Sequence, residues 1–191
     1  MEVIGRNAGS RAIAEADERE NLLSIYGRID ERSRSIASTH DWWPCREGCD
    51  GCCRSLARLP DLTMPEWALL WHGFLRLPAP VQALIRRRVA DLAENTPPEA
   101  DAPIVCPLLD RNHGACLVYE QRPAACRTYG FYVERGSGLW CGIITALLAE
   151  HGEDDITWGS QPGIDHALHS PGSERTGLLE WFAAHPEDSE E

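Results

Sequence analysis

The chain has 191 residues and a formal net charge of −12, with 43% apolar and 25% charged residues. These values are typical of a globular protein of about one domain with a substantial core. Because nucleic acid is bound by basic surfaces, the acidic balance argues against a nucleic-acid partner. All 18 basic residues are arginines, which excludes mechanisms that require a lysine, such as Schiff-base formation.

The sequence contains no segment typical of a signal peptide or of a membrane span. Acidic residues occur early in the N-terminal stretch, and the longest apolar run, residues 140–149, is half of the about 20 residues that cross a bilayer. We therefore expect a cytoplasmic protein without a membrane partner. Thiols stay reduced in that compartment, so clustered cysteines more often bind metal, although an even number of cysteines leaves a disulfide framework as the alternative.

Three helices are predicted in the first half of the chain. Apolar residues recur at helical spacing over residues 11–39, which favours one long amphipathic helix. A second helix is expected to begin after Thr63, with Glu66 completing a capping box. The apolar pattern over residues 79–95 predicts a third helix. The apolar stripes of all three are expected to form core.

A proline-rich stretch at residues 96–103 is predicted to be a linker between two cysteine-bearing halves. Beyond it, residues 104–109 and 115–120 are typical of two short strands, and residues 110–114 of the turn between them. This pattern predicts a small β-hairpin.

The remainder of the chain is predicted to be helical in three places. A short helix is expected to begin near Pro123, and residues 141–152 have the length of a helix that ends on a glycine. Residues 152–172 have no clear periodicity, and a last short helix is expected behind a Ser173 cap. The tail after Pro186 is predicted to be disordered.

These elements predict a mostly helical α+β fold, with helices around a small β-hairpin and a cysteine-ligated metal centre. We divide the chain into an N-terminal helix at residues 1–40 and a cysteine-cluster metal-binding domain at residues 41–150. A C-terminal extension at residues 151–191 follows, with a short helix and a disordered acidic tail.

The cysteines are the candidate metal ligands, because short spacings within a glycine-containing loop let the backbone wrap around one ion or cluster. The first group has the pattern C-x3-C-x2-C-C, which is improbable for cysteines that only fill the core. The eight candidates are Cys45, Cys49, Cys52, Cys53, Cys106, Cys116, Cys126 and Cys141. Cys141 alone is equally well explained as a buried apolar residue.

The adjacent pair Cys52 and Cys53 constrains the number of metal sites. Neighbouring side chains point in different directions, so the two thiols do not easily bind one tetrahedral ion together. Either one of them is spare or the loop lies between two metals. Eight thiols are enough for two four-ligand sites, or for one cluster with additional thiols, and the spacing does not choose between them.

A shell of thiolates suits zinc and iron–sulfur clusters alike, and we favour an iron–sulfur cluster over zinc. His113 is expected to be a turn residue rather than a ligand. Arg54, Arg122 and Arg127 lie beside cysteines in the sequence. They would either neutralise an anionic thiolate site or bind an anionic substrate, and we favour neutralisation because it requires no additional ligand.

The two cysteine segments, CREGCDGCCR at residues 45–54 and CPLLDRNHGACLVYEQRPAACRTYGF at residues 106–131, together resemble the YkgJ-type cysteine-cluster family. This is a family of zinc- or iron-chelating domains named for a CxxCxxCC signature. The resemblance covers about residues 45–141 and implies metal chelation without implying a reaction. The first gap has three residues where the name implies two, so Cys45 departs from the family pattern. The same region is similar to bacterial flagellin lysine N-methylases.

Three classes of function follow from these observations. The first is a module that binds a metal ion or cluster in a structural, storage or electron-transfer role. The second is a cluster-dependent enzyme, either methylase-like or radical S-adenosylmethionine-like, the latter from its C-x3-C-x2-C spacing. The chain lacks the strand–helix alternation of a barrel, which argues against that enzyme class. The third is a zinc-stapled protein–protein adaptor, whose protein partner the sequence does not identify.

Overall fold

The computed structural model describes residues 5–95, 102–169 and 174–186. The mostly helical α+β fold predicted from the sequence is confirmed: in these ranges seven α-helices and one 3-10 helix surround short strands. The α-helices are α1 (Gly5–Thr39), α2 (Met64–Leu75), α3 (Ala79–Asn95), α4 (Ala124–Thr128), α5 (Gly142–His151), α6 (Gln161–Leu168) and α7 (Leu178–Ala183). The 3-10 helix is η1 (Tyr119–Gln121).

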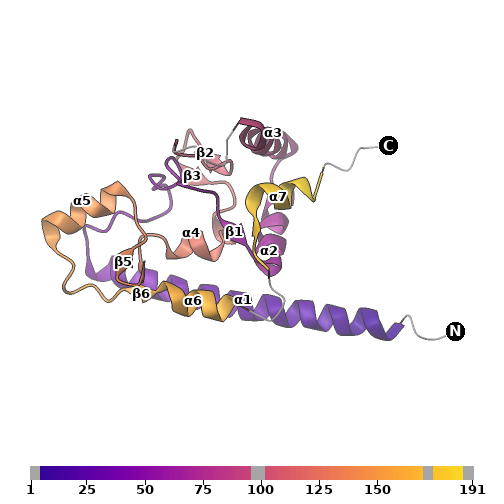
Figure 1. Ribbon diagram of the computed structural model, residues 1–191, viewed down its shortest axis with the longest axis horizontal. Helices are drawn as coiled ribbons and strands as arrows, with labels where there is room; N and C mark the ends of the chain where they lie inside the picture. Colours follow the sequence, from indigo (N-terminus) through magenta and orange to yellow (C-terminus); the bar gives the residue numbers. More distant parts are fainter. Residues whose placement is uncertain (1–4, 96–101, 170–173, 187–191) are drawn as a thin grey trace.

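The long helix α1 runs along one edge of the molecule, and α2, α4 and α6 pack against it (Figure 1). It ends at Thr39 as predicted and begins earlier than residue 11. Its buried face includes Ile25, Ile29 and Ile36, which recur at helical spacing. Residues 14–21 are exposed, so the N-terminal part of α1 extends beyond the body of the protein.

The start of α2 is fixed by Glu66, which is only 2% exposed. As the capping box predicts, its carboxylate accepts a hydrogen bond from the Thr63 backbone N–H at 3.0 Å. The same carboxylate accepts from the Ala124 N–H at the start of α4, at 2.9 Å, and from the Tyr26 hydroxyl in α1, at 3.4 Å. One buried carboxylate therefore joins three helices.

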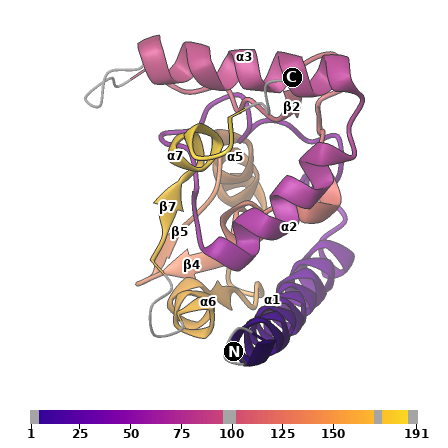
Figure 2. The same ribbon diagram turned by 90° about the vertical axis from the view of Figure 1, so that its right-hand side faces the viewer.

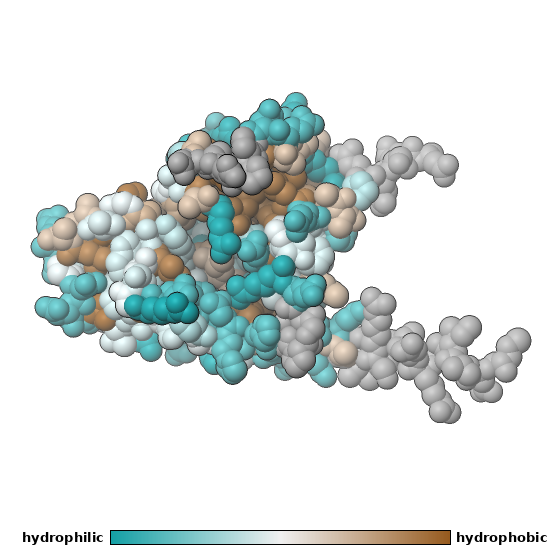
Figure 3. Space-filling view, viewed as in Figure 1, coloured by the Kyte–Doolittle hydropathy of each residue, from teal (hydrophilic) through white to brown (hydrophobic). Residues whose placement is uncertain are grey.

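The apolar core consists of two clusters. The first packs α1 against α5, α6 and the segment around Trp43 and Phe131. The second lies between α2, α3 and α7 and includes Phe74 and Phe182; Figure 2 shows α3 and α7 on the same side of the molecule. In Figure 3 apolar side chains gather in the upper part of the view, in the region of α2, α3 and α7.

The predicted hairpin exists but is much shorter than the sequence indicates. Strands β2 (Leu109–Asp110) and β3 (Ala115–Cys116) are antiparallel, with Leu109 opposite Cys116. The preceding residues do not pair with β3, because Ile104 forms an antiparallel bridge with Leu56 instead. Cys116 therefore lies within the ladder, opposite Leu109, whereas Cys106 lies before β2 and outside it.

Two further small sheets complete the described fold. Strand β4 (Tyr132–Glu134) lies between β5 (Ser137–Gly138), which is antiparallel to it, and β6 (Gly159–Ser160), which is parallel. Strand β1 (Asp61–Leu62) pairs with β7 (Thr176–Gly177) and thereby ties the C-terminal segment to the start of α2. None of these strands was predicted from the sequence.

The C-terminal elements differ in part from the predictions. Helix α5 ends at His151, and Gly152 directly after it has φ +84°, in agreement with the predicted glycine at the helix C-terminus. Helix α6 lies in a stretch without clear periodicity, and α7 begins at Leu178 after Gly177 rather than directly behind Ser173. Ser173, most of the predicted linker and most of the acidic tail lie outside the described residues. Within the described ranges, none of the helices combines the length and the apolar character that crossing a bilayer would require.

Candidate metal centre

The first four cysteines lie in the irregular loop that follows α1. Backbone hydrogen bonds shape this loop: the Cys49 N–H donates to the Arg46 carbonyl oxygen, and the Arg54 N–H to that of Asp50, both at 3.0 Å. Gly48 has φ +87°, a conformation that glycine adopts without strain. All eight cysteines are free and partly buried, so no disulfide framework is formed.

Main-chain hydrogen bonds join this loop to the second cysteine segment. The Cys106 N–H donates to the Cys53 carbonyl oxygen at 2.8 Å, and Leu56 and Ile104 exchange both of their backbone hydrogen bonds. The two segments are separated in sequence by two helices, α2 and α3, and by the stretch predicted to be a linker. Backbone hydrogen bonds therefore hold the two segments together across this distance in the sequence.

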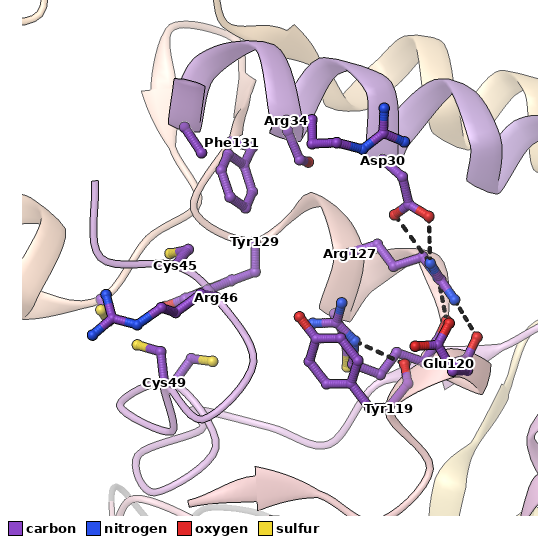
Figure 4. A pocket seen from close by; sticks show the side chains of 16 residues that line it. Asp30, Arg34, Cys45, Arg46, Cys49, Tyr119, Glu120, Arg127, Tyr129 and Phe131 are labelled. Carbon is purple, nitrogen blue, oxygen red and sulfur yellow. Dashed lines mark hydrogen bonds and ion pairs between the residues drawn. The ribbon is translucent and has the colours of Figure 1, made fainter. Parts of the chain in front are cut away.

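A cavity of about 300 Å³ lies between α1, the cysteine loop and the segment around α4. In Figure 4, Cys45 and Cys49 lie on one side of this cavity, and Tyr119, Glu120 and Arg127 on the other. Five of the eight candidate ligands line it: Cys45, Cys49, Cys52, Cys126 and Cys141. The structure thus brings thiols from three separate parts of the chain to one cavity.

The thiols fall into two groups according to which of them affect one another's pKa. The first group consists of Cys45, Cys49 and Cys141. Burial raises the pKa of Cys45 to about 12, and the neighbouring charges of Cys49, Cys141 and Cys52 raise it further. This group also packs against the first apolar cluster, through Cys45 and Cys141. Metal-free, the Cys45 thiol is therefore protonated at neutral pH, and metal binding there would release a proton.

The second group is Cys106, Cys116 and Cys126. Burial raises the pKa of all three, that of Cys126 to about 12, and the charges of the group raise the pKa of Cys106 and Cys126 further. Cys106 and Cys116 pack against the second apolar cluster.

Cys52 lies at the junction of the two groups. Its charge raises the pKa of Cys45 in the first group and of the three cysteines in the second. Its own pKa is raised, first by the contact with the Cys53 Sγ, 4.0 Å away, and then by burial. The adjacent pair that the sequence singled out is therefore the point where the two groups of thiols meet.

Gly130 allows the close approach of the chain to Cys45. Its φ is +91°, and a Cβ at this position would lie 2.8 Å from the Cys45 Sγ and 2.9 Å from the Ile144 Cδ1. Neither the backbone conformation nor the space suits a side chain. The sequence analysis did not identify this residue, although it lies in the Cys-Arg-Thr-Tyr-Gly-Phe segment of the resemblance.

The three arginines beside cysteines have different surroundings. Arg127 is buried and donates to both carboxylate oxygens of Asp30, at 3.0 and 2.8 Å, which ties α4 to α1. Arg54 is paired with Asp50. Arg122 lies with its guanidinium 3.7 Å from the centre of the Tyr119 ring, and its charge lowers the pKa of Cys116 and Cys126. Of the three, Arg122 is the best placed to neutralise thiolates.

His113 lies in the turn between β2 and β3. Its Nδ1 is 2.7 Å from the Asp110 carboxylate, and its side chain is 79% exposed. The histidine is thus held by the turn and is exposed, whereas the thiols are partly buried.

Comparison with known proteins gives one family. Residues 44–142, just over half of the chain and including all eight cysteines, match CxxCxxCC, described as "Putative zinc- or iron-chelating domain". The chain belongs to the CxxCxxCC family. Neither the curated proteins nor the solved structures include a match to it. The family predicted from the cysteine pattern is thereby confirmed.

The donor set of this CxxCxxCC domain fits zinc or iron in its chemistry, because thiolates bind both. The arrangement of donors is more open than that of a closed zinc site. Among the described residues, no three His, Cys, Asp or Glu side chains are grouped so that they could hold a metal ion. In a tetrahedral zinc site each sulfur lies about 2.3 Å from the ion, so all four sulfurs are neighbours. Binding one ion would therefore require the cysteine side chains to move closer together.

Proposed function

We propose that this CxxCxxCC domain binds iron as an iron–sulfur cluster, within the zinc- or iron-chelating role of its family. The observation that carries the proposal is the wide arrangement of thiols around one cavity. Five thiols line the cavity, while no three described donors are grouped for a single ion. A cluster of several iron atoms takes its thiolates from points spread over its surface, which such an arrangement supplies.

The surroundings of the thiols support the same choice. Cys45 and Cys141 pack against the first apolar cluster, which contains Trp43 and Phe131. These apolar neighbours exclude water, and solvent exclusion is one of the properties by which a protein sets the potential of a bound cluster. A bound cluster would supply one-electron chemistry, and the chain's own residues would hold it and shield it.

All eight cysteines are proposed ligands, in the two groups described above. Cys52 and Cys53, at the junction, would serve one group each, which explains why two thiols are needed side by side. One set of four thiols would consist of Cys45, Cys49, Cys141 and one thiol of this pair. The other set would consist of Cys106, Cys116, Cys126 and the remaining thiol of the pair. The iron content separates the alternatives, because one [4Fe–4S] cluster gives about four iron atoms per chain and two clusters give about eight.

The test is metal and sulfide analysis of protein purified without oxygen. We expect brown protein with visible charge-transfer absorbance, iron and acid-labile sulfide. Replacing Cys49 or Cys126 with serine should lower both contents, whereas His113→Ala, which changes an exposed turn residue, should leave them unchanged. Colourless protein with stoichiometric zinc under the same conditions would refute the cluster while leaving chelation by the family intact.

A further inference from the structure

Positive charge is concentrated at the cavity of a chain whose net charge is −12. Two carboxylates line the cavity, those of Asp30 and Glu120, and both oxygens of Asp30 accept hydrogen bonds from Arg127. Four arginines are among the lining residues, Arg34, Arg46, Arg122 and Arg127, and the guanidinium of Arg46 points away from Tyr119 and Arg127 (Figure 4). Within the described part of the chain, Arg34, Arg46 and Arg122 form no ion pair with a carboxylate. Within the described residues, the charges of Arg34 and Arg122 are thus not neutralised by a carboxylate.

We propose that the side of this cavity that lies opposite Cys45 and Cys49, around Tyr119 and Arg122, is a binding site for a small organic anion, a carboxylate or a phosphate monoester. Guanidinium groups bind both kinds of oxyanion through paired hydrogen bonds. The proposal stands on the arginines and on the cavity, and it holds whether the thiols bind iron or zinc.

Arg122 is already oriented for such a ligand. Its Nε donates to the Tyr119 carbonyl oxygen at 3.0 Å, and its guanidinium is stacked on the Tyr119 ring. These contacts fix the plane of the group and leave its two terminal nitrogens without a hydrogen-bond partner among the described residues. A guanidinium that is fixed before binding loses little conformational freedom when the ligand arrives.

The walls of the cavity indicate an organic anion of limited size. The volume of about 300 Å³ is at the lower end of the range for small-molecule sites, and it is shared with the thiols that would hold the metal, so only part of it is open to the anion. The aromatic rings of Tyr119, Tyr129 and Phe131 line it together with Ala37, and they would contact a ring or a short carbon chain. Burial raises the pKa of Tyr119 and Tyr129, so both hydroxyls stay protonated and can donate to an oxyanion.

The competing explanation is that the arginines only neutralise thiolates of the metal centre. Arg122 fits that role as well, because its charge lowers the pKa of Cys45, Cys116 and Cys126. Arg34 does not fit it. Figure 4 shows Arg34 on the α1 side of the cavity near Asp30, across from Cys49. Since Asp30 is already paired with Arg127, the charge of Arg34 is left for a ligand.

The experiment is calorimetric titration of the full metal-loaded chain with phenyl phosphate and with benzoate. Phenol and benzamide serve as neutral controls of the same size. We expect at least one anion to bind with a Kd below about 1 mM and at least about tenfold more tightly than its neutral control, with affinity falling as salt is added. The two probes distinguish a phosphate site from a carboxylate site.

Three variants locate the site. Arg34→Gln and Arg122→Gln should each weaken anion binding by about tenfold or more. Arg58→Gln should leave it unchanged, because Arg58 is exposed, pairs with Asp61 and does not line the cavity. Metal and sulfide are measured for every variant, so a zinc-loaded protein that binds the anion supports this site even if the cluster is refuted. The proposal would be overturned if neither anion binds, or if the neutral controls bind equally well. It would also be overturned if Arg34→Gln loses anion binding only when it loses its metal as well.

Discussion

Replacing Glu66 with alanine should destabilise the protein strongly, because its carboxylate is buried and accepts four hydrogen bonds. The Thr63 N–H and hydroxyl each lie 3.0 Å from one carboxylate oxygen. The Ala124 N–H at 2.9 Å and the Tyr26 hydroxyl at 3.4 Å donate to the other. The alanine variant leaves all four donors without this acceptor.

The two backbone N–H groups decide the magnitude. A buried donor that loses its acceptor costs about 1–3 kcal/mol, so the pair costs about 2–6 kcal/mol. The hydroxyls can rotate toward other acceptors and add less. We expect the free energy of unfolding to fall by about 4 kcal/mol, a large part of the about 5–15 kcal/mol that stabilises a typical domain.

The assay is urea unfolding of the metal-loaded protein, at a fixed metal concentration, followed by tryptophan fluorescence. Glu180→Ala is the matched control, because Glu180 occupies the same position at the start of α7 and accepts from the Gly177 N–H at 3.4 Å in an exposed setting. This control should lose about 0.5 kcal/mol or less. If Glu66→Ala costs no more than Glu180→Ala, the carboxylate does not join the three helices energetically.

Two further predictions concern backbone geometry and pH. Gly130→Ala should lower the free energy of unfolding by about 1–2 kcal/mol for its left-handed backbone and by a further about 1–3 kcal/mol for the contact with Cys45. Gly136→Ala is the control, because Gly136 has φ +81° and nothing within 4 Å of a Cβ, so that it should show the backbone cost alone. Equal losses of stability in the thermal unfolding of the two variants would refute the contact. Burial and the neighbouring Glu66 raise the pKa of Tyr26 above its ordinary value of 10.0, so its contribution to stability is present below pH 10 and is lost as the pH rises further. Tyr26→Phe should therefore make the alkaline fall in the free energy of unfolding shallower, and an unchanged fall would contradict this role.

The helices that could be predicted from the sequence are those whose ends are set locally. Helix α2 begins at a capping box formed by Thr63 and Glu66, and α3 follows the apolar pattern over residues 79–95. The end of α5 at Gly152 is likewise a property of one residue. In these places neighbouring residues alone determine the structure.

The short strands could not be predicted, because long-range contacts determine them. Strand β6 has two residues and exists through parallel pairing with β4, which is more than 20 residues earlier. Residues 104–106 have the composition of a strand but pair with the cysteine loop rather than with β3. A two-residue strand is too short to have a measurable period.

The candidate site could be predicted in its chemistry and not in its assembly. Spacing identified the eight thiols and the family, but it did not show which thiols line the cavity. Arg127 was noticed for its place beside Cys126, whereas its partner Asp30 is 97 residues away in α1. Arg34 belongs to no cysteine motif and Gly130 has no side chain, so both become relevant only through the folded structure.

The backbone pairing between residues 53–56 and 104–106 has a consequence for how metal is taken up. These hydrogen bonds close a loop of about fifty residues, so the main chain itself bears part of the entropy cost of bringing the two thiol groups together. We therefore expect the helices to persist when a stronger chelator removes the metal, as circular dichroism before and after chelation would show. The metal is then an exchangeable guest rather than the only crosslink between the two segments.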